Sequence, residues 1–337
     1  MTSHATISLA HGGGGLLSRE LIREEIVSRF GEGPLRGLPD AARLPTGAGA
    51  EFLFTTDSYV VHPVEFPGGN IGSLAVHGTV NDLCVCGGRP RWLSLGLILE
   101  EGLPFDLLRR ILDAARDATV ACGVTVATGD TKVVARGQCD RIYINTSGIG
   151  EPIPGFRLGM DAIRPGDAVL VSGTLGDHGM AVLSVREGIG IRGGPVSDSA
   201  PVIRLVEAAG AVADRVRFMR DPTRGGAASV LNEIVGGQPF GVQLRETDLP
   251  FAVGARAAAE MLGLDLLQVA CEGRVILVCA DDAAGTILDA WRRLPEGRNA
   301  APIGAITGRA GQVVLETLMG GHRLVDVPQG ELLPRIC

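Results

Sequence analysis

The sequence predicts an α/β protein, in the α+β sense, built from two domains. Short β-branched and apolar runs alternate with segments whose apolar residues recur every three to four positions, and both halves of the 337-residue chain show this alternation. Prolines and a glycine interrupt the pattern at 151–155. A chain of this length is long enough for two hydrophobic cores. We therefore predict domains at 1–152 and 153–327, followed by a flexible tail at 328–337.

The elements follow from apolar periodicity and from glycine or proline stops. In the first half we predict helices at 17–30, 69–82 and 105–122 and strands at 52–61, 92–99, 124–128 and 141–149. In the second half we predict helices at 177–187, 201–209, 223–235 and 282–294, and strands at 168–172, 217–219, 275–279 and within 303–327. The segment 31–45 has no periodicity and is predicted to be a loop.

Composition excludes several classes of protein. A formal net charge of −7 argues against nucleic acids and anionic membranes as partners. No apolar run reaches the roughly 18 residues of a membrane span, and the first ten residues lack the features of a signal peptide, so we predict a cytoplasmic protein. Seven cysteines, an odd number, predict reduced thiols in preference to a disulfide framework.

Three predicted elements carry a carboxylate at or near an end. Asp57 interrupts the strand 52–61, Asp82 ends the helix 69–82, and Asp130 follows the strand 124–128. Carboxylate oxygens beside glycine turns suit Mg²⁺, a hard cation that commonly shares its ligands with substrate phosphates. The alternative is that each aspartate only caps a turn.

The chain uses arginine almost exclusively as its cation. It has 31 Lys and Arg residues together, and the printed sequence contains a single lysine, Lys132, in the run Gly129-Asp130-Thr131-Lys132. Arg replaces Lys on most exposed surfaces but not where a compact or titratable amine is needed. We therefore predict a functional role for Lys132, against the alternative of chance retention.

Glycines and a tight turn supply further candidate sites. His11 and Gly12 open a glycine run that leads into the helix 17–30, where backbone N–H groups are able to bind an anion; a mobile arm is the alternative. Asp221 precedes another helix, either as its cap or beside a phosphate attracted by Arg224. Glu272 lies in a tight turn before the strand 275–279.

The tail ends in a cysteine. Prolines and a glycine prevent 328–337 from forming a helix or a central strand, so we predict an arm about 30 Å long when extended. A thiol on such an arm is able to visit more than one site. The predicted role of Cys337 is that of a carrier, and the alternative is an irregular end that happens to finish in Cys.

Several motifs together carry a resemblance to a known family. They are 10–15, 66–70, 79–82, 98–104, 128–134, 171–179, 221–226, 271–273 and the final 334–337. With these motifs the chain resembles the HypE family of hydrogenase maturation proteins over essentially its whole length. The wider superfamily includes aminoimidazole ribonucleotide synthetase, whose two-domain fold is called PurM-like. The end Pro334 to Cys337 indicates the HypE family in particular.

The resemblance implies a fold and a reaction. The first domain pairs across a homodimer into a β-barrel that helps to house ATP. A HypF-type carbamoyltransferase loads a carbamoyl group onto Cys337, and the protein dehydrates it to a thiocyanate with ATP. A HypC/HypD-type scaffold then receives the cyano group for the iron of a [NiFe] hydrogenase.

The resemblance also assigns residues. Mg²⁺ is expected at Asp57, Asp82 and Asp130, while Cys337, Lys132 and Glu272 are expected to be catalytic. The expected ATP site adds the following residues: Asn81, Gly129, Asp221, His11 and Gly12. Whether Lys132 or Glu272 is the base stays open. Two other hypotheses remain: a kinase or synthetase of the superfamily that acts on a free small molecule, and a thiol or metal chaperone that uses Cys84, Cys86 and Cys337.

Overall fold

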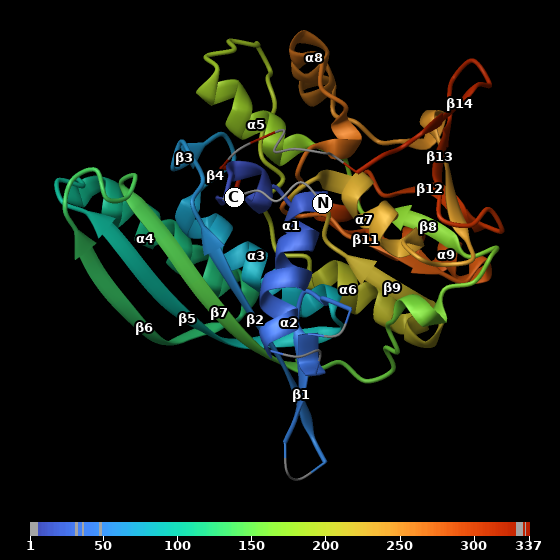
Figure 1. Cartoon of the computed structure of the whole chain (residues 1–337), viewed down its shortest axis with the longest axis horizontal. Coiled ribbons are helices and arrows are strands. Elements are labelled where there is room, and N and C mark those ends of the chain that lie inside the picture. Colours follow the sequence, from blue (N-terminus) through green and yellow to red (C-terminus); the bar gives the residue numbers. More distant parts are fainter. Residues whose placement is uncertain (1–5, 31–32, 36, 47–48, 328–332, 334) are drawn as a thin grey trace.

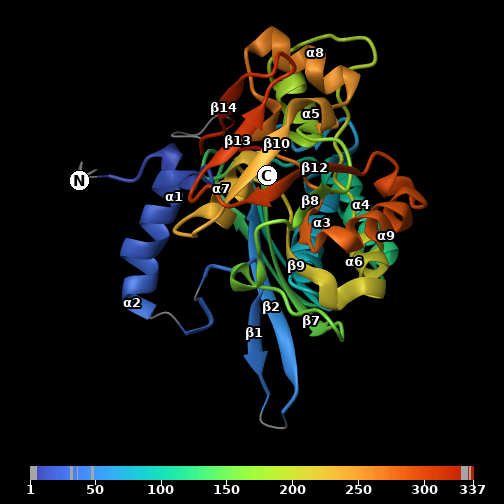
Figure 2. The same ribbon diagram turned by 90° about the vertical axis from the view of Figure 1, so that its right-hand side faces the viewer.

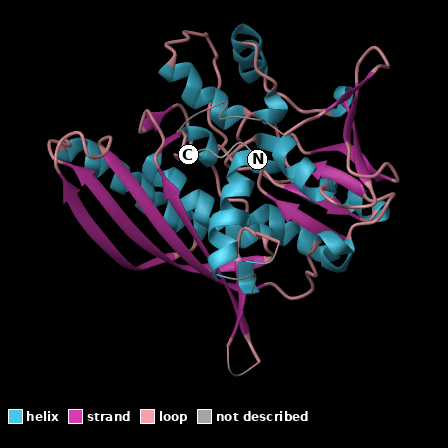
Figure 3. Cartoon of the chain, in the orientation of Figure 1, coloured by secondary structure: helices cyan, strands magenta, loops and turns pink. Residues whose placement is uncertain are grey.

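Two sheets form the framework of the chain (Figure 1). The computed structural model describes residues 6–30, 33–35, 37–46, 49–327, 333 and 335–337. A five-stranded sheet has the order β1-β2-β7-β5-β6, and a seven-stranded sheet has the order β14-β13-β10-β12-β8-β11-β9. Both sheets are mixed, because β5–β6 and β10–β13 are parallel pairs within otherwise antiparallel sheets. Figure 3 shows the two sheets on either side of the helices between them.

The first sheet comes from the first half of the chain. Its strands are β1 (Ala42–Pro45), β2 (Glu51–Tyr59), β5 (Gly88–Glu100), β6 (Thr125–Val134) and β7 (Ile142–Pro152). Helices α3 (Ile71–Val85) and α4 (Phe105–Cys122) pack together on one face of it. The short pair β3 (Glu65–Phe66) and β4 (Gly69–Asn70) precedes α3, which Asn70 caps by accepting a hydrogen bond from Gly72 N at 2.9 Å.

The small residues of α3 allow close packing. A Cβ on Gly72 would lie 2.1 Å from the carbonyl oxygen of Ile111 in α4, and one on Gly78 would lie 2.2 Å from the hydroxyl of Tyr59. Small residues along a helix also occur where the helix faces a ligand. The structure shows that Gly72 instead permits contact with α4, whereas Gly78 faces Tyr59 and also lines a cavity described below.

The second sheet comes from the second half of the chain. Its strands are β8 (Ala168–Val171), β9 (Val216–Arg220), β10 (Gly241–Arg245), β11 (Ile276–Cys279), β12 (Ala301–Thr307), β13 (Val313–Glu316) and β14 (His322–Leu324). The helices of this half are α5 (Asp177–Arg186), α6 (Ile203–Ala209), α7 (Gly226–Val235), α8 (Val253–Leu262) and α9 (Asp281–Arg292). In the described ranges, no helix is both long and apolar enough to cross a bilayer.

One apolar cluster joins the two halves. It contains Val80 of α3 and Ala118 of α4 together with Leu205 of α6 and Trp291 of α9, all nearly or fully buried. The indole of Trp291 also donates a hydrogen bond to the Leu205 carbonyl at 2.8 Å. This cluster holds α3 against the second half, while another apolar cluster lies within the second half alone.

The N-terminal helix stands beside the two sheets, as Figure 2 shows. It comprises α1 (Leu16–Leu21), a π-helical stretch (Ile22–Val27) and α2 (Ser28–Phe30). Its extent confirms the predicted helix at 17–30. By contrast, β1 lies within 31–45, where the sequence predicted only a loop, and β10 and α8 fall where no element was predicted.

Candidate active site

Five segments of the chain bring carboxylates to one cavity. The acidic cavity, about 400 Å³ in volume, is lined by side chains from both halves of the chain, which include Asp40, Asp57, Asp82, Asp221 and Glu272. Carboxylate oxygens of Asp40, Asp82 and Asp221 all lie within 4.8 Å of one another. These oxygens are hard ligands, so this group of three fits Mg²⁺.

Neighbouring polar groups hold the side chains of Asp40 and Asp82 in place. Arg220, at the end of β9, forms ion pairs with Asp40 at 2.8 Å and with Glu233 at 2.7 Å. The hydroxyl of Thr55 in β2 lies 2.8 Å from a carboxylate oxygen of Asp82 and 2.6 Å from the Asp40 carbonyl oxygen. The acids are thus fixed by the ends of α3 and β9 and by the loop before β1.

Burial and mutual repulsion disfavour ionisation of the cluster. Burial, and after it the charge of Asp57, raises the pKa of Asp82 well above its usual range. Burial, and after it the charge of Asp40, does the same to the pKa of Asp221. Burial raises the pKa of Asp40 to about 6, although Arg220 opposes this. A divalent cation would relieve the repulsion among these acids, which Arg220 offsets in part at Asp40 and Asp221 and the Thr55 hydroxyl offsets in part at Asp82.

Asp57 joins the cavity from β2. Its carboxylate accepts a hydrogen bond from the hydroxyl of Tyr59 at 3.0 Å, and burial raises its pKa. Asp57 therefore lies next to the group of three without belonging to it. The sequence missed Asp40 as the third acid, because Asp40 lies in a segment without periodicity and only its contact with Arg220 distinguishes it.

Glu272 reaches the same cavity from the turn before β11. Its side chain is 2% exposed, and burial raises its pKa well above the usual range, with smaller contributions from Asp221 and Asp198. Among the described residues, none donates a hydrogen bond to its Oε1 atom. A buried carboxylate in an open cavity, with one oxygen not committed to the protein, is suited to accept a proton.

The described end of the tail lies beside this cavity. Val60 N donates a hydrogen bond to the backbone oxygen of Cys337 at 3.0 Å, and His62 N donates one to the Arg335 carbonyl at 3.2 Å, so these residues extend alongside the end of β2. Cys337 lines the acidic cavity. Residues 328–332 and 334 of the predicted flexible tail lie outside the described residues.

A second cavity meets the first at Cys337. The tail cavity, about 380 Å³ in volume, is lined by His11 and Gly12, by Ile336 and Cys337, and by Arg224. Arg224 also lines the acidic cavity, donates a hydrogen bond to the Gly12 carbonyl at 3.1 Å, and has its pKa raised chiefly by the negative charge at Cys337. The predicted glycine run therefore adjoins the thiol and a cation.

Four predicted residues lie away from these cavities in the described chain. Asn81 is buried, donates hydrogen bonds to the carbonyls of Ala200 and Glu272, each at 3.0 Å, and accepts one from Val202 N at 2.9 Å. Its amide is thus engaged in joining α3 to the second half of the chain. The other three, Gly129, Asp130 and Lys132, lie on β6.

The sheet order explains the position of β6. Strands β7 and β5 lie between β2 and β6, so Asp57 and Asp130 are on opposite sides of two strands. Asp130 and Lys132 are exposed and pair with each other at 3.1 Å. Within one chain, Asp130 therefore does not join Asp57 and Asp82 as the sequence predicted. A Cβ on Gly129 would lie 2.3 Å from the Leu95 carbonyl, so this glycine is needed for β5–β6 packing.

The Cys84 and Cys86 thiols are poorly suited to metal binding. Cys84 is fully buried, and burial raises its pKa well above the usual range. Burial raises the pKa of Cys86 as well, and its sulfur accepts a hydrogen bond from Ala41 N at 3.2 Å. Thiols that resist ionisation do not favour the chaperone hypothesis, since the thiolate is the metal ligand.

Asp82→Asn is expected to stabilise the metal-free protein and to abolish most of its stabilisation by Mg²⁺. A carboxyl group whose pKa is higher in the folded than in the unfolded chain makes the protein less stable as the pH rises above the usual pKa of that group. Asn does not ionise, so the variant avoids this loss of stability. We expect a rise in Tm of about 2 °C or more without Mg²⁺ at neutral pH.

Thermal unfolding with and without Mg²⁺ measures both effects. Asp113→Asn is the control, because Asp113 is exposed on α4 and pairs only with Arg116 among the described residues. If the Asp82→Asn protein gains as much stability from Mg²⁺ as the wild type, Asp82 is not a ligand of the proposed ion.

The chain matches two family models and close relatives over nearly its full length. The models are "AIR synthase related protein, N-terminal domain" at 39–151 and "AIR synthase related protein, C-terminal domain" at 164–316. Carbamoyl dehydratase HypE of Rhodobacter capsulatus is 47% identical over 336 residues, which cover 98% of each chain.

Solved structures of such relatives have the same fold. A hydrogenase maturation protein HypE in complex with ATP superposes with a TM-score of 0.82 at 45% identity, covering 98% of this chain and 100% of that one. A HypE–HypF complex gives a TM-score of 0.86 at 40% identity, covering 91% of this chain and 99% of the other. The fold is accordingly the two-domain PurM-like α/β fold with mixed sheets.

Proposed function

The chain belongs to the HypE family of carbamoyl dehydratases, within the AIR synthase-related proteins, and we propose that it uses ATP to dehydrate a carbamoyl group carried on its own Cys337. One observation carries this proposal: Cys337 lines the same cavity as Glu272 and the three clustered aspartates. A relative solved with ATP supports the nucleotide. The test is ATP-dependent loss of water from carbamoylated Cys337.

The reaction needs a leaving group that the amide itself lacks. The carbonyl oxygen of the S-carbamoyl group attacks the γ-phosphorus of ATP, and the bond from that phosphorus to the ADP oxygen breaks. Both protons of the amide nitrogen are then lost, the C–O bond breaks, and phosphate leaves with the former carbonyl oxygen. The products are the thiocyanate of Cys337, ADP and phosphate, so the oxygen of the removed water ends in phosphate.

The acidic cluster and Arg224 would hold the nucleotide. Asp40, Asp82 and Asp221 would bind Mg²⁺, with Asp57 next to them. Mg²⁺ supplies neutralisation of the phosphate charge that these acids would otherwise repel. Arg224 and the glycine run beside it, which includes Gly12, offer a guanidinium and backbone N–H groups to phosphate oxygens.

Glu272 is the base that the cavity best supports. Its buried carboxylate has a raised pKa and an oxygen atom not bound to the described protein, whereas Lys132 is exposed on β6 of the same chain. A base of raised pKa accepts an amide proton more readily than an ordinary carboxylate. Glu272 would therefore remove protons from the nitrogen of the phosphorylated carbamoyl group.

Other proteins would act before and after this step. A HypF-type carbamoyltransferase would load Cys337, and a relative has been solved as a HypE–HypF complex. A HypC/HypD-type scaffold would receive the cyano group for the iron of a [NiFe] hydrogenase. The proposed setting is cytoplasmic, and with a net charge of −7 we propose no role for nucleic acid or a membrane.

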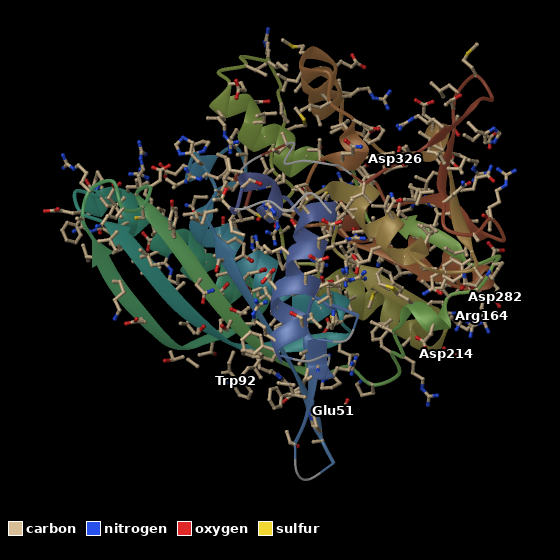
Figure 4. The ribbon with its side chains drawn as sticks, viewed as in Figure 1. Glu51, Trp92, Arg164, Asp214, Asp282 and Asp326 are labelled. Carbon is tan, nitrogen blue, oxygen red and sulfur yellow. The ribbon has the colours of Figure 1, made fainter. Side chains whose placement is uncertain are left out.

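The face of the first sheet opposite α3 and α4 is suited to a homodimer. Phe54, Trp92 and Ile98 are 38%, 48% and 41% exposed there, and Phe54 and Trp92 both pair with Ile149 across the sheet. Figure 4 shows Trp92 near the base of the hairpin that carries Glu51. Apolar side chains gathered on a bare sheet face favour pairing with a second sheet.

A homodimer would give Asp130 and Lys132 a role that they lack within one chain. Asp130 pairs with Gly96 and Lys132 with Ile98, which places both side chains on the uncovered face of the sheet. We propose that sheets of two subunits pack through this face as a β-barrel. Lys132 of one subunit would then act at the Cys337 site of its partner.

Lys132→Arg is expected to slow dehydration by roughly 10²-fold while carbamoyl loading persists. The guanidinium keeps the charge, but it is larger and does not release its proton. Stability should hardly change, because the side chain is 69% exposed. The measurement is single-turnover conversion of pre-carbamoylated protein with ATP.

Mixed dimers separate the two possible positions of Lys132. A Lys132→Arg chain retains Cys337, and a Cys337→Ala chain retains Lys132, so their mixed dimer restores one complete site only if the lysine acts across the interface. Activity of the mixture is the expected result. Inactive mixed dimers would overturn the shared site, and a fully active Lys132→Arg homodimer would overturn the role of the lysine.

A further inference from the structure

The docked end of the tail is recognised mainly through its backbone. Besides the two hydrogen bonds from Val60 N and His62 N, the guanidinium of Arg186 in α5 donates to the Arg335 carbonyl at 2.8 Å. Ile336 is 3% exposed and packs in the cluster that contains Val182 and Ala270. The backbone oxygens of residues 335, 336 and 337 each accept a hydrogen bond, so the register of the tail is fixed.

His178 of α5 makes the remaining hydrogen bond of this series. It is fully buried, and its Nε2 lies 2.7 Å from the Ile336 carbonyl oxygen. A carbonyl only accepts, so Nε2 must carry the proton. The other ring nitrogen, Nδ1, lies 2.8 Å from the hydroxyl of Ser197, which donates to it when the ring is neutral. Burial lowers the pKa of His178, consistent with a neutral ring.

Ser197 is adjacent to the residue that holds the Glu272 turn. The Asp198 side chain is fully buried, and its carboxylate accepts hydrogen bonds from the backbone N–H groups of Glu272 at 3.3 Å and Gly273 at 3.2 Å. A continuous series of contacts thus runs from the tail carbonyl through His178, Ser197 and Asp198 to the backbone of the proposed base.

We propose that His178 is a positioning residue that binds the tail in its docked register and couples that register to the orientation of Glu272. The inference rests on the proposed function for its role in dehydration, but not for the docking itself. His178 touches the carbonyl of Ile336, one residue before the thiol that must enter the cavity, while its other nitrogen contacts the segment that holds the turn of Glu272. One ring therefore orients both reacting partners.

The first test measures docking without turnover. Cys337 is alkylated with a bulky maleimide, and its modification is followed by peptide mapping. His178→Phe retains a ring against Phe66, whose centroid lies 5.2 Å away, but loses both hydrogen bonds. We expect alkylation of Cys337 to be roughly tenfold faster in this variant, because the undocked fraction increases. His178→Gln, which retains an N–H donor, is expected to restore most of the protection.

His77→Phe is the matched control. His77 hydrogen-bonds through Nδ1 to the hydroxyl of Ser199 at 3.0 Å, in the same segment, and belongs to α3. The His77→Phe variant should be alkylated at Cys337 at nearly the wild-type rate. If both variants accelerate alkylation equally, the cause is a loosened 197–199 segment and the proposal is overturned. An unchanged alkylation rate in a folded His178→Phe protein would also overturn it.

The second test measures coupling. Ser197→Ala removes the hydroxyl that contacts His178 and that also accepts a hydrogen bond from Ser199 N at 3.1 Å. This variant keeps the coupling testable if His178→Phe fails to fold. We expect single-turnover dehydration to fall roughly tenfold with little change in ATP binding or in carbamoyl loading. Normal dehydration in this variant would contradict the coupling. A wild-type protein that shows protection but no dehydration would instead refute the proposed function and leave the docking role of His178 standing.

Discussion

Glu272→Gln is expected to slow dehydration of carbamoylated Cys337 by roughly 10²–10⁴-fold, the usual contribution of a positioned general base. The amide has nearly the shape of the carboxylate, so the backbone hydrogen bonds from Glu272 and Gly273 to Asp198 should persist. Nucleotide binding should be retained or strengthened, because one of the negative charges that line the cavity is lost. Single-turnover conversion with ATP, followed by intact mass, measures the effect.

The pH dependence identifies the proton acceptor. A base acts only when it is ionised, and burial raises the pKa of Glu272, so the wild-type rate should increase with pH through a range above that of an ordinary glutamate. This increase should be absent from the Gln variant and present, at lower rate, in Glu272→Asp. A Gln variant with the rate and pH profile of the wild type would show that another group removes the protons.

Cys337→Ser is expected to abolish both the modified chain and the ATP turnover that depends on carbamoyl loading. Oxygen replaces sulfur with little change in volume, so the backbone hydrogen bond from Val60 N to residue 337 and the buried position of Ile336 should remain. A serine hydroxyl stays protonated at neutral pH, whereas the thiol is able to supply a nucleophilic thiolate. Tm and ATP binding should therefore be nearly unchanged.

This variant separates the proposal from its nearest alternative. A kinase or synthetase of the same superfamily acting on a free small molecule would not need the thiol, and its ATP turnover would survive in Cys337→Ser. Phosphate release measured with the loading partner present, and again without it, distinguishes the two. Turnover that persists in the Ser variant at the wild-type rate would reject Cys337 as the carrier.

Much of the cavity could be predicted from motifs in the sequence. Asp57, Asp82, Asp221 and Glu272 all line it together with Cys337, although they come from four separate stretches of the chain. Each lies near the end of an element or in a turn, where local patterns of glycine and apolar residues are informative.

The remaining features depend on contacts that have no local signal. Asp40 lies in an aperiodic segment and is identified by Arg220, 180 positions away in the chain and 2.8 Å away in space. Asp130 was expected beside Asp57 because both follow or interrupt strands, but the order of strands in a sheet is set by tertiary pairing. The docking of the tail depends on His178 and Arg186, which belong to a helix far from it in sequence.

Every step of the proposed reaction depends on Cys337 carrying the group that is dehydrated with ATP. The most direct measurement is the intact mass of the chain after incubation with a HypF-type partner, carbamoyl phosphate and ATP. We predict a species heavier by about 43 Da when loading stops at the carbamoyl group, then loss of about 18 Da once ATP is supplied for dehydration, with both changes mapped to Cys337. A carbamoylated chain whose mass stays constant with ATP, or a modification on any other residue, would contradict the account.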